Sequence, residues 1–193
     1  MTLMANAQSS SSPDSVCAGA NGKTYKVTST PGNQCHWSIT GGGSIITSST
    51  LDSIQINWSS TPGTDTIKVV ETNPIGCLGD TISLPVVRLP IPTVVLSGSD
   101  SICQYSASTT FKLKMNFTGV SPWTVTYLED GVSRSVTTTS NPYTFNSQVY
   151  SNGGIKSYSI SNLNGRLGCN GTKSGAAAIT VFPKPTTSAI SHY

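Results

Sequence analysis

The side chains that could do chemistry in this chain of 193 residues are five cysteines, two histidines and eight carboxylates. A Ser-His-Asp triad would need a histidine beside a carboxylate and a nucleophile. His36 stands between Cys35 and Trp37 in a segment of strand type, so its side chain points to solvent if those two face inward. His192 lies in a C-terminal tail. We therefore expect neither histidine to be catalytic.

The carboxylates are dispersed along the chain. Glu129 and Asp130 are adjacent, but Gly131 follows them, and this combination is typical of a turn rather than of a glycosidase pair. No dense Asp/Asn loop of the calcium-binding type is present. The three glycines at 41–43 lack the lysine and helix start of a phosphate loop, and we interpret them as a hairpin-type turn. The sequence therefore predicts no enzyme, no metal site and no cofactor.

The cysteines form no Cys-x-x-Cys pair, which argues against a zinc site and favours disulfides in an oxidising compartment. Charged residues make up 10% of the chain, and its net charge of +3 comes from scattered residues, so we expect no nucleic-acid partner. No apolar run reaches the roughly 18 residues of a membrane-spanning helix. The abundant Ser, Thr, Gly and Pro favour short strands joined by turns.

The chain repeats itself once. Cys17, in Asp-Ser-Val-Cys, returns as Cys103, in Asp-Ser-Ile-Cys, and Trp37 and Trp123 follow these two cysteines at equal spacing. A Gly-Cys-x-Gly segment and then a Pro-x-Pro-Thr segment follow in both halves. Matches in one order indicate two homologous modules. We expect a flexible N-terminus or signal remnant over 1–12, modules over 13–91 and 92–187, and a tail over 188–193.

The N-terminal residues carry a second indication of export. Ala5-Asn6-Ala7 fits the small-residue pattern that ends a secretory signal peptide, although an accident of a tag would look the same.

Alternating apolar residues mark the strands within each module. We expect strands over 25–29, 35–40, 54–58, 66–71 and 81–88, and then over 111–117, 123–127 and around 158–160 and 179–181. Many short strands in each module predict an all-β chain of two tandem β-sandwich domains, with Trp37 and Trp123 in the two cores.

The repeat also predicts the disulfides. Cys17 is expected to pair with Cys77, and Cys103 with Cys169. Each bridge would close a long loop and stabilise its module by about 4 kcal/mol in the chain-entropy model. Cys35 is left over. It could be a reactive thiol or form an intermolecular bridge, but we favour a half-buried cysteine beside the core Trp37.

Several segments carry a resemblance to known domain families. They are Cys17-Ala-Gly, Tyr25-Lys-Val, His36-Trp-Ser-Ile-Thr-Gly-Gly-Gly, Ile54-Gln-Ile-Asn-Trp58, Gly76-Cys77, Ser101-Ile-Cys103, Asn141-Pro-Tyr-Thr and Gly168-Cys169-Asn-Gly. Through them the first module is similar to the PKD-like domains found in repeat arrays of Bacteroidota surface proteins, and the second to the immunoglobulin-like repeats that accompany them.

The resemblance implies export to the cell surface, often by the type IX secretion system, and roles in gliding motility, adhesion or spacing. No sorting domain of that system follows Pro185, so we expect either a fragment of a longer protein or a small stand-alone component. The leading hypothesis is a structural or adhesive tandem of an exported protein, at the cell surface, outside the cell or in the periplasm. The alternatives are a component that binds a protein of the outer envelope and a module that binds surface glycans.

Two further patterns bear on these hypotheses. Asp followed by Ser or Thr and then Val or Ile resembles the O-glycosylation signal of Bacteroidota exported proteins, although a turn Asp before a strand would look the same. The signal would modify Ser15, Ser53, Thr66, Thr81 and Ser101. A glycan-binding face would need exposed aromatic residues, for which the candidates are Trp58, Tyr105, Tyr143 and Tyr150.

Overall fold

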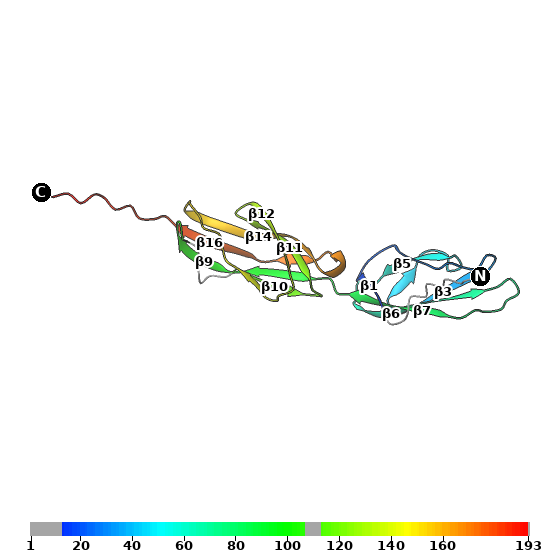
Figure 1. Ribbon diagram of the computed structural model, residues 1–193. Coiled ribbons are helices and arrows are strands. Elements are labelled where there is room, and N and C mark those ends of the chain that lie inside the picture. Colours follow the sequence, from blue (N-terminus) through cyan, green and yellow to red (C-terminus); the bar gives the residue numbers. More distant parts are fainter. Residues whose placement is uncertain (1–12, 107–112, 193) are drawn as a thin grey trace. The chain divides into compact units, whose positions relative to one another are not determined.

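The computed structural model describes residues 13–106 and 113–192 (Figure 1). The chain divides into two compact units, Met1–Pro90 and Ile91–Tyr193. The expected flexible segment or signal remnant over 1–12 lies outside the described residues, as do Phe111 and Lys112 at the start of one expected strand.

The first unit is built from two layers of strands. The larger sheet has the order β1-β7-β6-β3, and the smaller has the order β2-β5-β4. Figure 1 shows β5 in a layer apart from β6 and β7. The strands are β1 (Asp14–Cys17), β2 (Lys23–Lys26), β3 (Gln34–Thr40), β4 (Gly43–Ile45), β5 (Ser53–Trp58), β6 (Gly63–Thr72) and β7 (Ile82–Leu89).

The core of the first unit follows from the alternation of the sequence. In β3 the side chains of Cys35 and Trp37 are buried while His36 between them is exposed, and in β5 Ile54, Ile56 and Trp58 are buried. One face of each sheet is therefore apolar, and the two faces close on each other.

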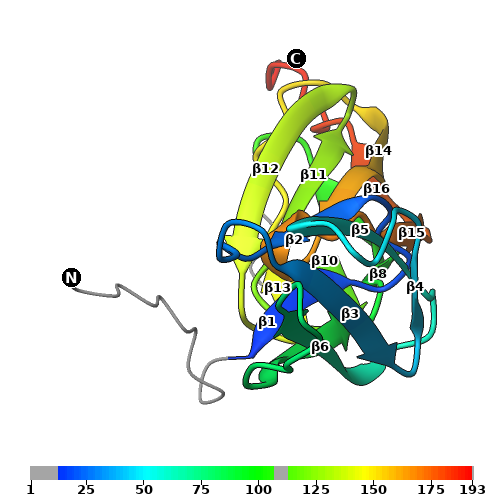
Figure 2. The same cartoon turned by 90° about the vertical axis from the view of Figure 1, so that its right-hand side faces the viewer.

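The second unit repeats this plan with more strands. Its larger sheet has the order β12-β11-β14-β16-β9, and its smaller sheet has the order β13-β10-β8-β15. The strands are β8 (Thr93–Ser97), β9 (Ser99–Cys103), β10 (Leu113–Thr118), β11 (Trp123–Glu129), β12 (Val132–Thr138), β13 (Tyr143–Phe145), β14 (Gly154–Asn164), β15 (Thr172–Ser174) and β16 (Ala176–Phe182), with one 3₁₀ turn, η1 (Arg166–Gly168). Figure 2 shows β11, β12, β14 and β16 from another side.

The prediction of two tandem all-β, immunoglobulin-like sandwich modules is confirmed. The described residues contain no α-helix. Buried apolar side chains form one core in each unit, and Trp37 and Trp123 belong to different cores. Trp123 stacks on Phe117 with ring centroids 4.8 Å apart.

The two larger sheets share one topology. In both, the first strand runs parallel to the last, and a cysteine ends that first strand: Cys17 lies opposite Leu89 and Cys103 opposite Phe182. In both, the last strand lies beside the preceding long strand, and that strand lies beside the tryptophan-bearing one. The duplication seen in the sequence is therefore also a duplication of strand order.

The two Gly-Cys-x-Gly segments form the same loop. The backbone N–H of Asn73 donates to the carbonyl of Cys77 at 3.1 Å, and Gly165 donates to Cys169 at 2.8 Å. Isolated bridges, Thr72 with Leu78 and Asn164 with Asn170, close the two loops in the same way. Cys77 and Cys169 are thus equivalent, as are Cys17 and Cys103.

The tryptophans are less strictly equivalent than their equal spacing suggested. Trp37 lies in the middle of β3, opposite Val69, whereas Trp123 is the first residue of β11. The two tryptophans therefore enter their cores from different positions along the corresponding strands, although their spacing from the cysteines is equal.

Candidate functional site

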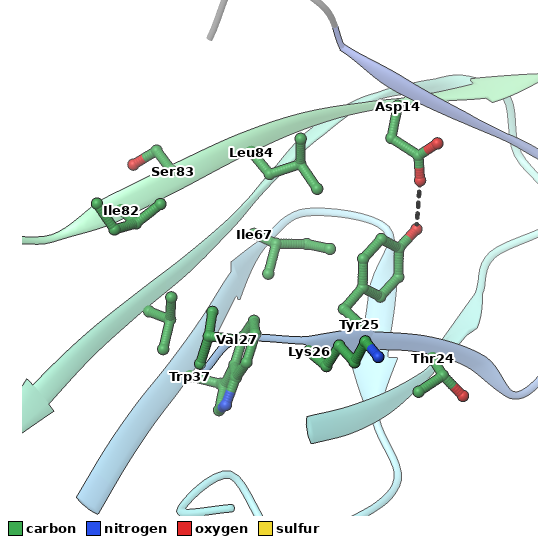
Figure 3. Close-up of a pocket in the computed structure, with 11 residues that line it drawn as sticks. Asp14, Thr24, Tyr25, Lys26, Val27, Trp37, Ile67, Ile82, Ser83 and Leu84 are labelled. Atoms are coloured by element: carbon green, nitrogen blue, oxygen red, sulfur yellow. Dashed lines mark hydrogen bonds between the residues drawn. The ribbon is translucent and has the colours of Figure 1, made fainter. Parts of the chain in front are cut away.

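A groove of about 690 Å³ opens at the side of the first module. Figure 3 shows Val27, Trp37, Ile67 and Leu84 around the opening. These side chains make an apolar floor, while Asp14, Thr24, Lys26 and Ser83 contribute polar groups to the lining. The groove lies where β2 of the smaller sheet faces β1, β6 and β7 of the larger one.

Tyr25 and Asp14 form the polar contact of the groove. The Tyr25 hydroxyl donates a hydrogen bond of 3.0 Å to Asp14 Oδ2 (Figure 3). Burial raises the pKa of Tyr25 above its ordinary value, and the charge of the Asp14 carboxylate raises it further. The phenol therefore stays protonated and serves as a donor, not as a base. The groove can hold an apolar group beside one hydroxyl and one carboxylate.

Both histidines are exposed, and His36 lies where the alternation of the sequence predicted. His36 is exposed on β3, on the face opposite to Cys35 and Trp37. His192 is exposed in the segment after β16 that carries no regular structure. Neither histidine has a hydrogen bond to a carboxylate among the interactions of the described residues.

Glu129 and Asp130 serve a hairpin, as the turn interpretation predicted. Glu129 lies opposite Val132, so Asp130 and Gly131 form a two-residue loop between β11 and β12. Both loop residues have positive φ, 50° at Asp130 and 84° at Gly131. This is the conformation that Asp-Gly favours in tight hairpins.

The Glu129 carboxylate is buried and fully engaged. It accepts hydrogen bonds from the Tyr158 hydroxyl and from Arg134 Nε, each at 3.0 Å. The Tyr158 hydroxyl lies 2.5 Å from that of Tyr150, which is also buried. Burial raises the pKa of Tyr158, as do its hydrogen bonds to Tyr150 and Glu129. The cluster joins β11, β12 and β14 and leaves no free carboxylate oxygen for a substrate.

The first module contains an ionic contact in which both side chains are buried. Asp65 and Arg88 are 3% and 7% exposed, and Arg88 Nε lies 2.5 Å from Asp65 Oδ2. Asp65 Oδ1 accepts a hydrogen bond from the Gly42 N–H at 2.7 Å, and Arg88 Nη1 donates to the carbonyl of Thr61. Sequence reasoning missed this pair. Its signal was a single arginine among the mostly apolar residues of β7.

The same contact explains the three consecutive glycines. A Cβ on Gly42 would lie 2.3 Å from Arg88 Cζ, and Gly41 has a φ of +86°. The turn leads from β3 in one sheet to β4 in the other, so our hairpin interpretation of these glycines was wrong. The glycines make room for the guanidinium group and place their backbone against Asp65.

The predicted disulfides are wrong. Cys17 and Cys169 are disulfide-bonded, whereas Cys77 and Cys103 are free and exposed. Neither Cys17–Cys77 nor Cys103–Cys169 is therefore present.

The topology gives the physical reason. Cys17 lies opposite Leu89, the last residue of β7, while Cys77 precedes the first residue of that strand. The eight residues of β7 span roughly 23 Å, and a disulfide requires Cα atoms within about 7 Å. In the second module, Cys103 lies opposite Phe182 at one end of the β14–β16 pair, and Cys169 lies beyond the other end.

Cys35 is a buried free thiol. It has no solvent-exposed surface, and its Sγ lies 3.9 Å from Asp52 Oδ1. Burial raises the pKa of Cys35, and the charges of Asp52 and Glu71 raise it further. We favoured a half-buried cysteine in the core beside Trp37, and Cys35 is instead completely buried in that core.

We expect Cys35 to resist alkylation in the folded protein, because only the thiolate reacts and the site disfavours it. A maleimide at pH 7.5 should label Cys77 and Cys103 first, and Cys35 only after denaturant is added. Raising the pH to 9 should leave Cys35 protected, since its pKa is shifted upward. Peptide mass spectrometry measures the labelling. Native Cys35 labelling within about tenfold of the Cys77 rate would contradict its burial.

The candidate glycosylation sites differ in exposure. Ser53, Thr81 and Ser101 are exposed, whereas Ser15 and Thr66 are half-buried. Thr66 donates its backbone N–H to Thr40 Oγ1 at 3.0 Å in the middle of β6. The surface thus presents three of the five hydroxyls to an enzyme.

Most of the candidate glycan-binding aromatics are not on the surface. Trp58 and Tyr150 are 3% and 5% exposed, and Tyr143 packs partly buried on Phe145 with centroids 5.8 Å apart. Tyr105 is 63% exposed. The four residues do not form an exposed row, because three of them belong to the cores or pack against them.

Within 13–106 and 113–192, no group of three or more His, Cys, Asp or Glu side chains is placed to hold a metal ion. The same residues include no helix with the length and apolar character needed to cross a membrane.

Among known protein families, one matches the sequence of the first module. The sequence model of the PKD-like domain family matches residues 3–86, which is less than half of the chain. A search of curated proteins found no match.

Solved structures resemble the chain at low identity. The fibronectin(III)-like modules of Clostridium thermocellum CbhA are 14% identical with a TM-score of 0.42, over 100% of this chain and 99% of that chain. An I-band fragment of titin is 11% identical with a TM-score of 0.40, over 90% of this chain and 63% of that chain.

Proposed function

We propose that this chain is a non-catalytic structural or adhesive tandem from an exported bacterial surface protein, with a PKD-like first module and an immunoglobulin-like second module. The proposal rests on the observation that the buried carboxylates are bonded to groups of their own modules. Asp65 is engaged by Arg88 and Gly42, and Glu129 by Tyr158 and Arg134, all within their own modules. Catalytic carboxylates face a cleft with unused hydrogen-bonding capacity, and these two do not.

Export is supported by the chemistry of the cysteines. Cys17 and Cys169 are disulfide-bonded, and such bonds persist in oxidising compartments. The exposed Ser53, Thr81 and Ser101 are the sites we propose for O-glycosylation in the native bacterium. Intact mass of protein purified from that bacterium tests this, because an unmodified mass would exclude glycosylation.

A genetic test separates structure from catalysis. We expect deletion of the gene to reduce attachment of the native bacterium to surfaces, and wild-type protein to restore it. Restoration by His36→Ala should equal restoration by wild type, because the exposed His36 has no catalytic partner. Unchanged attachment after deletion would contradict an adhesive role. Loss of function in His36→Ala, with normal protein level, would contradict a non-catalytic one.

A second candidate function is binding of an envelope protein, for example a component of type IX secretion or gliding. The groove beside Tyr25 favours it, because an apolar side chain could enter between Trp37 and Leu84. Ile82 lines the groove and is 45% exposed, so its substitution should leave the fold intact.

The variant Ile82→Arg tests this second candidate. It places a charge in the groove, so a partner held there should be lost from pull-downs of native envelope at equal bait. Val132→Arg is the matched control, since Val132 is 52% exposed in the other module. Equal recovery of every envelope protein with wild type and Ile82→Arg would exclude the groove as a binding site.

A further inference from the structure

The exposed thiols of Cys77 and Cys103 occupy positions whose equivalents in the other module are disulfide-bonded cysteines. Cys103 ends β9 as Cys17 ends β1, and Cys77 lies in the same loop as Cys169. Cys17 and Cys169 are disulfide-bonded, while Cys103 and Cys77 are free. Each of the two repeat positions is thus a bonded half-cystine in one module and an exposed thiol in the other.

Exposed apolar side chains accompany both thiols. Ile75 and Leu78 flank Cys77 and are 84% and 72% exposed. Near Cys103, Tyr105 and Phe182 are 63% and 54% exposed, and Phe182 lies directly opposite Cys103 in the sheet. Large apolar residues gathered around an exposed thiol are typical of a surface that another protein covers.

The positions of the cysteines, at a strand end or in a loop, indicate which thiol should bond to which. The two oxidised cysteines of the chain are one of each kind, a strand-end cysteine and a loop cysteine. The two free thiols are also one of each kind. Their own modules offer no partner, because the strand end and the loop lie at opposite ends of each larger sheet.

We propose that Cys103 of one copy of this chain forms a disulfide with Cys77 of a second copy, joining copies head to tail. The apolar pair Tyr105 and Phe182 would then face Ile75 and Leu78 of the next copy. Such a contact joins two different surfaces, so it leaves one thiol of each kind at the two ends and can be repeated.

The chemistry needs an oxidant, and a low-molecular-weight disulfide supplies it. The thiolate of Cys77 attacks oxidised glutathione, forms a mixed disulfide and releases one glutathione thiolate. The thiolate of Cys103 from the other copy then attacks the Cys77 sulfur and releases the second glutathione. Two protein thiols are oxidised and one glutathione disulfide is reduced. In the cell this step rests on the proposed export to an oxidising compartment.

The test uses the full purified chain with its native disulfide, held in a buffer of reduced and oxidised glutathione. Non-reducing electrophoresis should show dimers and larger species that collapse to monomer with dithiothreitol. Peptide mass spectrometry should identify a Cys77–Cys103 link between copies, which mixing of isotopically light and heavy chains distinguishes from a link within one copy. Cys35→Ser should leave the ladder unchanged, because Cys35 is buried.

Two single variants test whether Cys103 bonds only to Cys77 of another copy. Cys77→Ser alone and Cys103→Ser alone should each remain monomeric, and their mixture should form dimers and nothing larger. Dimers in either variant alone would overturn the proposal, as would a monomer with Cys77 bonded to Cys103 of the same copy, or glutathione adducts without dimer. These outcomes do not depend on where the protein resides, so failure of export in the cell would be recognised separately.

Discussion

Replacement of Asp65 by alanine is expected to lower the free energy of unfolding of the first module by about 3–5 kcal/mol, because it leaves the buried Arg88 without its partner. The same change removes the acceptor of the Gly42 N–H, which holds the turn between the two sheets. Urea unfolding, with hydrogen exchange followed in peptides of each module separately, measures the effect. The second module should be unaffected.

Two variants bracket this result. Thr64→Ala changes the exposed neighbour of Asp65 and should alter stability by no more than about 0.5 kcal/mol. The double variant Asp65→Leu with Arg88→Met should recover part of the loss, because an apolar pair leaves no buried charge. If Asp65→Ala unfolded at the same urea concentration as wild type, the pair would not be buried in solution as it is in the structure.

The second module is expected to lose stability steeply above pH 10. Burial raises the pKa of Tyr158 and of Tyr150, whose ordinary value is 10.0. Ionisation of these phenols is therefore easier in the unfolded chain. Their contribution to stability is full below about pH 10 and is lost as the pH rises above it, by about 1.4 kcal/mol per pH unit for each phenol.

Tyr158→Phe tests the source of this alkaline slope. The variant should be less stable at pH 7, because Glu129 loses a hydrogen bond, but its stability should fall less steeply between pH 10 and 12. Tyr105→Phe is the control, since Tyr105 is exposed and should leave the slope unchanged. An equal alkaline slope in wild type and Tyr158→Phe would contradict the buried position of this hydroxyl.

Local alternation was enough to predict strands that supply core residues, among them β3 and β5 of the first module and β10 and β11 of the second. In β3 and β5 every second residue is buried, so period-two patterning located them within one or two residues. The edge strand β12 was missed, because almost all of its side chains are exposed and polar and show no apolar face. The short strands β1 and β9, each the first strand of its larger sheet, were missed. Each pairs with the last strand of that sheet, which is distant in the sequence.

The cysteines show where sequence repeats stop being informative. The repeat correctly equated Cys17 with Cys103 and Cys77 with Cys169, which the shared loop and strand pairing establish. It carried no information on distance within a module. The parallel pairing of first and last strands places each strand-end cysteine away from the loop, and only the topology reveals this.

The buried polar groups were equally hidden. The Asp65–Arg88 pair joins residues from adjacent strands, and the Glu129–Tyr158 contact spans β11 and β14. Trp58 and Tyr150, named as candidates for an exposed glycan-binding face, are core residues because their strand or loop turns them inward. Side-chain direction at such positions depends on register, which the sequence of one chain does not fix.

Protease treatment of intact native cells tests the central claim, that this chain is an exposed segment of an exported surface protein, most directly. Proteinase K added outside the cells should remove the protein from an immunoblot while a periplasmic marker stays intact. Full protection of the protein until the outer membrane is permeabilised would contradict the claim.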